Sequence, residues 1–114
     1  MFVMKAMFFA IVFAMIGCDG HTSISGVVVD ENGKPLGGVQ VTLKTVNLDS
    51  KIENELIDEE MTEDNGEFQV AITHQPTNKL KFSLIAEKEN YNSYSEVIKA
   101  NYGDDNHRIT LEKK

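Results

Sequence analysis

The stretch that decides the fold runs from Ile24 to Leu43 and reads ISGVVVDENGKPLGGVQVTL. Its beginning is rich in β-branched residues, and the run of valines at 27–29 is typical of a central strand that is buried on both faces. Its end alternates apolar and polar residues, which is the period expected of a strand with one face in the core. The stretch therefore predicts two strands, from Ser23 to Asp30 and from Val39 to Lys44.

The segment between these two strands predicts a turn followed by a kink. Asn32-Gly33 readily takes the positive φ of a tight turn, and Pro35 has no N–H to give to a strand ladder. The same Asn-Gly pair returns at positions 65–66, between two further expected strands at 55–62 and 68–72. Because apolar and polar residues alternate after this second pair, it predicts a β-hairpin.

Three more short segments with alternating apolar residues follow, at 80–86, 91–98 and 108–112. None of the chain after the N-terminal segment repeats the apolar spacing of an amphipathic helix. Seven short strands separated by turns predict an all-β fold, a seven-stranded antiparallel β-sandwich. The stretch from Asn47 to Glu63 is acidic with few apolar residues, and we expect either an edge strand or a long exposed excursion there.

Length and charge set limits on the class of protein. The chain has 114 residues and a formal net charge of -7, which is enough for one domain. Removal of residues 1–17 would take away only Lys5 among the charged residues, so that 10 basic and 18 acidic residues would leave a net charge of -8. An acidic surface repels phosphate groups, and we therefore expect no binding to nucleic acid.

The N-terminus has the pattern of a signal peptide. Lys5 precedes an unbroken apolar run at 6–16, which is shorter than the ~20 residues of a membrane span. Gly17-Cys18 closes this run and resembles the lipobox of bacterial lipoproteins, although Met15 stands where that class usually has leucine. An incidental cysteine behind an ordinary secretory signal is the alternative interpretation.

The lipobox resemblance implies cleavage before Cys18 and anchoring of the mature protein by lipid on that cysteine. The domains would then be a lipoprotein signal peptide at 1–17, a lipid-anchored tether at 18–22 and a β-sandwich domain at 23–114. Thioether-linked diacylglycerol and a fatty acyl chain such as palmitate together hold a protein durably at a membrane. We expect a lipid-anchored protein of the cell membrane that faces the periplasm or the exterior, with inner and outer membrane both open.

The mature sequence resembles the carboxypeptidase regulatory-like domain. The resemblance rests on the Ile24–Leu43 stretch, on TEDNGEF at 62–68, on LKFSL at 80–84 and on Tyr91. It implies a transthyretin-like β-sandwich from about Ser23 to Leu111. It also implies an accessory module that accompanies other proteins and performs no chemistry of its own.

The sequence lacks the usual catalytic and metal-binding patterns, and we expect no enzyme activity, no cofactor and no metal. The histidines do not have zinc-site spacing and are interpreted as solvated surface residues; they are His21, His74 and His107. The oxygen-rich turns at 30–33, 63–66 and 104–106 lack the spacing of a calcium loop and are interpreted as solvated turns. No motif for a serine or cysteine nucleophile occurs.

Lysines and tyrosines suggest two other arrangements. An isopeptide bond from Lys44 or Lys81 to Asn101, as in similar pilin-type sandwiches, is disfavoured because all three residues fall on expected outward or loop positions. Tyr94 and Tyr102 could line a recognition surface, or they could simply cover strand edges.

The sequence leaves two functional hypotheses. The first is a non-catalytic binding or scaffolding module of the cell envelope that contacts an envelope protein or a surface polymer. The second is a passive structural spacer without a specific ligand. An exposed apolar patch near residues 47–63 or near Tyr94 and Tyr102 would favour the first, because a spacer has no reason to keep one.

Overall fold

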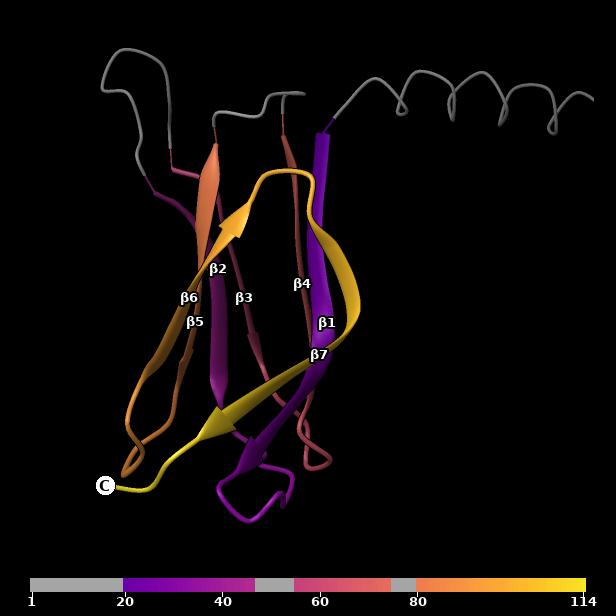
Figure 1. The fold of residues 1–114 in the computed structure, drawn as a ribbon. Coiled ribbons are helices and arrows are strands. Elements are labelled where there is room, and N and C mark those ends of the chain that lie inside the picture. Colours follow the sequence, from indigo (N-terminus) through magenta and orange to yellow (C-terminus); the bar gives the residue numbers. More distant parts are fainter. Residues whose placement is uncertain (1–19, 47–54, 75–79) are drawn as a thin grey trace, which may run out of the picture.

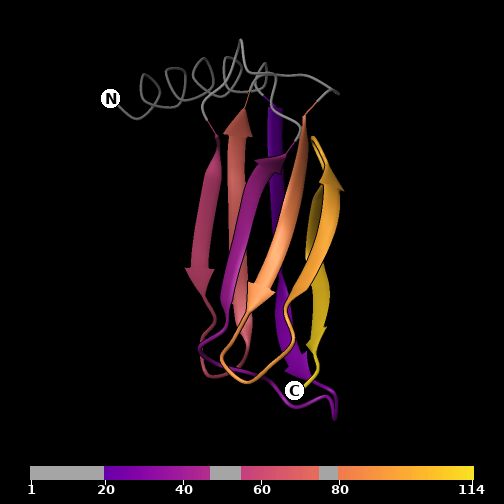
Figure 2. The same cartoon turned by 90° about the vertical axis from the view of Figure 1, so that its left-hand side faces the viewer.

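The computed structural model describes residues 20–46, 55–74 and 80–114, which form two stacked β-sheets (Figures 1 and 2). The strands, in chain order, are β1 Gly20–Asp30, β2 Gln40–Val46, β3 Ile57–Met61, β4 Glu67–His74, β5 Lys81–Glu87, β6 Tyr94–Lys99 and β7 Gly103–Leu111. The prediction of an all-β sandwich with seven strands is confirmed. The expected signal peptide and Cys18 lie outside the described residues.

The sheets have the strand orders β4-β1-β7 and β3-β2-β5-β6, called sheet A and sheet B below. The prediction that all strands are antiparallel is wrong at one place, because β1 and β7 pair in parallel. The chain reverses direction at every connection, so all odd-numbered strands run the same way (Figure 1). When the first and the seventh strand meet in sheet A, they must therefore be parallel neighbours.

The core fills the space between the two sheets. Alternate residues of each strand point inward, as the period of two requires. The largest fully buried side chains are Phe82, Ile24, Leu43, Leu84, Ile109 and Leu111. Full burial of an aliphatic or aromatic side chain of this size contributes about 1.5–3 kcal/mol, so this layer dominates the stability of the domain.

The kinked turn after β1 forms as expected, and its backbone explains how it tolerates a proline. Gly33 has a φ of 83°, and the carboxylate of Asp30 accepts the N–H groups of Asn32 and Lys34 at 2.8 and 2.9 Å. Pro35 forms an isolated bridge with Val29, in contrast to the expectation of no pairing. The bridge is possible because the N–H groups of the flanking residues make its hydrogen bonds.

Several element boundaries differ from the sequence-based expectation. Strand β1 begins at Gly20, so residues 20–22, expected to belong to a tether, continue the central strand of sheet A. Strand β7 begins at Gly103 instead of Arg108. In the acidic stretch 47–63, residues 57–61 form the edge strand β3 of sheet B, while residues 47–54 lie outside the described part of the chain.

Candidate functional site

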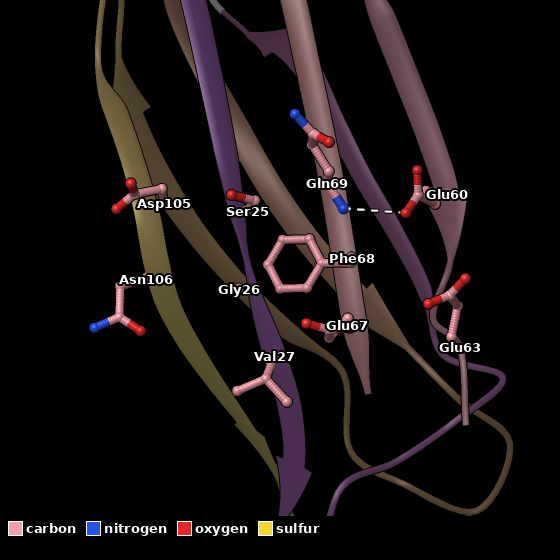
Figure 3. A pocket seen from close by; sticks show the side chains of 10 residues that line it. All are labelled: Ser25, Gly26, Val27, Glu60, Glu63, Glu67, Phe68, Gln69, Asp105 and Asn106. Carbon is pink, nitrogen blue, oxygen red and sulfur yellow. Dashed lines mark hydrogen bonds between the residues drawn. The ribbon is translucent and has the colours of Figure 1, made fainter. Parts of the chain in front are cut away.

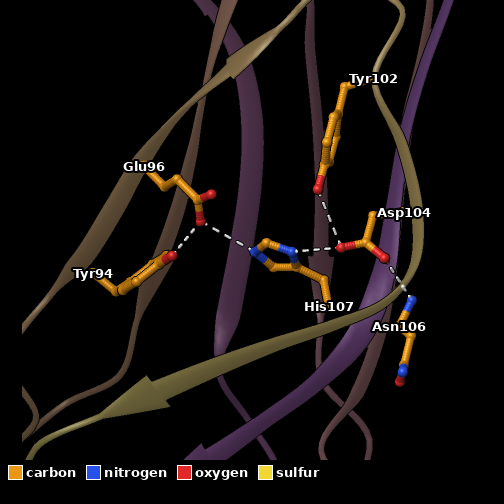
Figure 4. A network of polar contacts seen from close by, with 6 residues as sticks. All are labelled: Tyr94, Glu96, Tyr102, Asp104, Asn106 and His107. Carbon is orange, nitrogen blue, oxygen red and sulfur yellow. Dashed lines mark hydrogen bonds and ion pairs between the residues drawn. The ribbon is translucent and has the colours of Figure 1, made fainter.

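A polar cluster joins the two sheets at the side where β6 and β7 lie (Figure 4). The imidazole of His107 on β7 lies between two carboxylates: Nδ1 is 2.9 Å from Asp104 and Nε2 is 3.1 Å from Glu96 on β6. The hydroxyl of Tyr94 donates to Glu96, and that of Tyr102 lies 3.3 Å from Asp104. We call these five residues the His107 network.

The sequence places these side chains together by strand alternation and a turn. Tyr94 and Glu96 are two residues apart on β6, so they share its inward face with the buried Ile98. Asp104 also accepts the backbone N–H of Asn106 at 2.9 Å, which fixes its carboxylate near His107. Each acidic residue of the network thus has a further hydrogen-bond partner on its own strand besides His107.

Electrostatics in the network favours an ionised Asp104 carboxylate and neutral phenols on Tyr94 and Tyr102. The N–H of Asn106, followed by His107, lowers the pKa of Asp104 below its ordinary value. Burial, together with the adjacent Glu96 carboxylate, raises the pKa of Tyr94 to about 12. The pKa of Tyr102 is raised by desolvation and by Asp104.

The arrangement is suited to cross-linking two sheets rather than to binding a metal. A carboxylate can only accept, so an imidazolium, with an N–H on each nitrogen, is the form that donates to Asp104 and Glu96 together. Both ring nitrogens then have partners, and neither is free to coordinate an ion. Within residues 20–46, 55–74 and 80–114, no group of three or more His, Cys, Asp or Glu residues is arranged to hold a metal ion.

The prediction of solvated surface histidines is wrong for two of the three. His107 is half-buried in its network, and His74 is buried, with Nε2 2.8 Å from the hydroxyl of Thr22 and its ring 5.4 Å from that of Phe82. His21 is exposed on β1. The burial of His74 had a signal in the sequence, because it continues the alternation of inward residues along β4.

The oxygen-rich turns use their side chains to bind their own backbone. Asp30 caps the first turn, as described above, and Asp104 caps the N–H of Asn106. Asn65 accepts the N–H of Glu67 at 3.0 Å. These contacts support the interpretation of the turns as structural, and they account for the choice of Asp and Asn at those positions.

A shallow depression on the outer face of sheet A is rich in acids (Figure 3). It has a volume of about 500 Å³, and its carboxylates come from Glu60, Glu63, Glu67 and Asp105. One of these carboxylates already has a structural role, because Glu60 accepts the backbone N–H of Gln69 at 3.1 Å, the contact drawn in Figure 3. The neighbouring N–H of Ala71 donates to Asp58 at 2.8 Å.

Tyr94 and Tyr102 lie together in the His107 network, and Tyr91 lies apart from them. Tyr94 is half-buried in the His107 network, Tyr102 is 39% exposed, and Tyr91 packs against the core. Exposed apolar side chains also lie on the outer face of sheet B, where Ile57 and Met61 are on one edge strand and Val97 is on the other; they are 50–66% exposed. No pattern in the sequence predicts these exposed positions, because they are single apolar residues on two strands that are not neighbours.

The residues considered for an isopeptide bond lie on the surface or near it. Lys81 and Asn101 are exposed, and Lys44 is half-buried on β2. This agrees with the outward or loop positions expected from the sequence.

Comparison with known proteins identifies the architecture but no family. No family model matches the chain, and no curated protein sequence resembles it significantly. Among solved structures, 3-chlorocatechol 1,2-dioxygenase from Rhodococcus opacus 1CP is similar, with a TM-score of 0.60 and 15% sequence identity over 82% of this chain. The match spans 60% of the dioxygenase chain, and at this identity it is evidence for the sandwich fold alone. In the described residues, no helix is long and apolar enough to cross a membrane.

Proposed function

We propose that the protein is a lipoprotein of the cell envelope, whose β-sandwich serves as a non-catalytic binding or scaffolding module. The observation that carries this proposal is the position of Gly20, where β1 begins, two residues after Cys18. Two residues span at most about 7 Å, so lipid on Cys18 would hold the domain directly against a bilayer. The strand attached to the lipid is the central strand of sheet A, which pairs with both neighbours and would transmit the attachment to the whole domain.

The resemblance to the carboxypeptidase regulatory-like domain supports an accessory role. The turns that carry it contain Gly33 and Gly66, and both glycines adopt positive φ, which glycine takes at little cost. The two-sheet architecture is also the one that the resemblance implies. Membership of that family remains our proposal, and with it the inference that the domain assists other proteins.

A binding module is favoured over a passive spacer by the outer face of sheet B. Ile57, Met61 and Val97 are each at least half exposed there, and they lie on one sheet face. Ile57 and Val97 lie in one row across the sheet with Lys44 and Ser83 between them, so the face offers a partner apolar contacts beside a basic side chain. The spacer hypothesis gives no reason for their position.

The proposal of a non-catalytic role rests on the chemistry of the His107 network. Its imidazole has both nitrogens engaged by carboxylates, so it is not poised to take a proton from a substrate. The structural similarity to a dioxygenase concerns the sandwich fold, and we infer no activity from it.

Metabolic labelling with an alkyne analogue of palmitate tests the anchor in cells that process lipoproteins. We expect the wild-type chain to incorporate the label and the Cys18→Ser variant to lack it. Ser25→Ala, on β1, is the matched control and should be labelled like wild type. A wild-type chain that stays unlabelled while other lipoproteins of the same cells are labelled would contradict the proposal.

A further inference from the structure

The outer face of sheet B has a basic and apolar patch at the end where β1 begins. Lys81 on β5 lies directly opposite Lys99 on β6. Lys44 on β2 lies opposite Ser83, which follows Lys81 by two residues on the same face. Apolar side chains alternate with these lysines in the strand register; they are Val46, Val97 and Ile57. We call these six residues the anchor-end patch. Figure 2 shows that the ends of β2 and β6 and the start of β5 lie at the same end of the sandwich as the start of β1.

Two features of the patch indicate a negatively charged partner. Like charges directly opposite one another in a sheet repel, so the Lys81 and Lys99 pair is unfavourable without an anion nearby. In the part of the chain that the structure describes, the ion pairs are those of His107 with Glu96 and Asp104, and the three lysines take part in none.

The opposite end of the same face has the opposite charge. Glu59 on β3 and Glu87 on β5 lie there, in register with Thr42 and Gln40 of β2. On this face Lys44, Lys81 and Lys99 thus lie toward the end nearest to Cys18, although the chain as a whole has a net charge of -7. A surface that binds the patch must therefore be anionic, and it must lie at the anchor end.

We propose that the anchor-end patch docks on the anionic headgroups of the lipid bilayer that holds the lipid anchor. This inference rests on the proposed function, since the short link from Cys18 to Gly20 brings the patch to the bilayer. Lysine side chains reach headgroup phosphates while their methylene stems lie along the apolar side chains beside them. Val97 is 66% exposed and Ile57 50% exposed, so both are accessible for insertion at the headgroup boundary. Glu59 and Glu87 on the same face then lie farther from the membrane than the three lysines.

Site-directed labelling of the lipidated protein tests the proposal. Cys18 is the only cysteine of the chain and would be acylated, so an introduced cysteine is the only free thiol. We would place a nitroxide on Val97→Cys and, as the matched control, on Met61→Cys, which is 57% exposed on the same face at the other end. Both proteins are reconstituted in phosphatidylcholine vesicles with and without phosphatidylglycerol.

The expected result is at least a threefold lower collision rate of the Val97 label with a water-soluble nickel complex when phosphatidylglycerol is present. The Met61 label should be unchanged in both vesicles. A second pair of variants tests the charges: Lys81→Gln with Lys99→Gln should abolish the protection, whereas Lys113→Gln with Lys114→Gln removes the same charge at the distal end and should preserve it.

The possible failures are distinguishable. Intact mass of the purified protein shows whether lipid is attached; a chain without lipid contradicts the proposed function and removes the basis of the docking. A lipidated chain whose two labels respond alike to phosphatidylglycerol contradicts the docking alone. Protection of both labels in neutral vesicles would assign this face to a second copy of the chain and would also overturn the proposal.

Discussion

Thr62 holds the kinked turn against the end of β3. Its hydroxyl accepts the backbone N–H of Val39 at 2.9 Å and donates to the carbonyl oxygen of Leu36 at 2.8 Å, and the residue is buried. Both partners are backbone groups in the interior. Loss of the hydroxyl therefore removes one hydrogen bond from the N–H of Val39 and one from the carbonyl oxygen of Leu36. A single side chain thus secures the link between the first two strands and the turn that joins β3 to β4. The β-hairpin predicted at Asn65-Gly66 is wrong, because β3 and β4 lie in different sheets and the turn crosses from one sheet to the other.

Replacement of Thr62 by valine, which keeps the shape and removes the hydroxyl, is expected to lower the free energy of unfolding by about 2 kcal/mol. Urea denaturation of the purified mature protein measures the change. Thr110→Val, at an exposed position on β7, is the control and should change stability by less than about 0.5 kcal/mol. Equal stability of the two variants would show that the Thr62 hydroxyl bonds do not matter.

The titration of Tyr94 reports directly on the His107 network. Its pKa of about 12 has burial as its first cause and the Glu96 carboxylate as its second. We expect Glu96→Gln to lower this pKa toward the ordinary value of 10.0, because the amide removes the negative charge that opposes ionisation. Absorbance at the tyrosinate band, followed as pH is raised, measures the shift.

Two variants complete this titration. Tyr94→Phe identifies the phase that belongs to Tyr94, and Glu89→Gln, at an exposed position between β5 and β6, should leave that phase in place. If the Tyr94 phase of the titration stays at the same pH in Glu96→Gln, burial alone sets the pKa of Tyr94.

At the residue scale, the sequence predicts inward positions well and polar partners poorly. Alternation along β4 extends to His74, so its burial could have been inferred from Phe68, Val70 and Ile72. The position of His107 between two carboxylates could not, because Glu96 lies on another sheet. Contacts across the sandwich depend on how the sheets stack, which strand periodicity does not encode.

At the element scale, β1 depends on a glycine where it meets β7. A Cβ atom on Gly26 would lie 1.7 Å from the carbonyl oxygen of His107, and this pairing lies at an irregularity in the β1–β7 register. The backbones of the two strands approach so closely that no side chain fits between them. The glycine in the fold-deciding stretch is therefore explained by a strand far away in the sequence.

Gly26→Ala is expected to cost more than about 3 kcal/mol, because the obstacle is backbone and cannot move aside without loss of strand pairing. Circular dichroism and urea denaturation measure the loss. Gly103→Ala is the control, since a Cβ there meets nothing within 4 Å. A Gly26→Ala protein as stable as wild type would show that β7 can shift away from β1.

The β4 edge of sheet A is covered by side chains of β3 in sheet B. Along β4 the N–H groups of Gln69 and Ala71 donate to Glu60 and Asp58 of β3. Unpaired strand edges invite pairing with other chains, and these carboxylates occupy the donors that such pairing would use. The sequence predicts either an edge strand or an exposed excursion in this acidic stretch. The carboxylates of β3 thus have a structural role in covering the neighbouring strand edge.

Removal of both carboxylates in Asp58→Ala with Glu60→Ala is expected to speed hydrogen exchange at the amides of Gln69 and Ala71 about 10-fold. Exchange followed by NMR resolves the individual amides. Glu59→Ala, on the opposite face of the same strand, is the control and should leave both rates unchanged. Unaltered rates in the double variant would show that the two amides are protected by other means.

The elements themselves could be predicted because each strand carries its own alternation and two of the tight turns carry an Asn-Gly pair. The parallel pairing of β1 and β7 was missed because it depends on the number of chain reversals between them and on the order of strands in the sheet. The start of β7 at Gly103 was missed for a related reason. Residues 103–107 are polar, and they extend as a strand because β1 offers an edge to pair with.

At the scale of the whole molecule, the proposed lipid anchor and the charges on the outer face of sheet B favour the same orientation of the domain on a bilayer. The basic and apolar patch lies at the end nearest to Cys18, and the other end of the same sheet face carries Glu59 and Glu87. An anchored domain with this distribution is expected to take one orientation on an anionic bilayer. Met61, which is exposed on sheet B at the far end, would then face a partner away from the lipid.

Lipid on Cys18 is the proposal on which the orientation of the whole domain depends, and intact-mass analysis of the membrane fraction tests it most directly. Cells expressing the full chain are compared with cells expressing Cys18→Ala. We predict a wild-type protein that begins at Cys18 and carries a diacylglyceryl mass, and a variant that lacks this mass. A wild-type mature protein that is free of lipid and recovered away from the membrane would contradict the proposal.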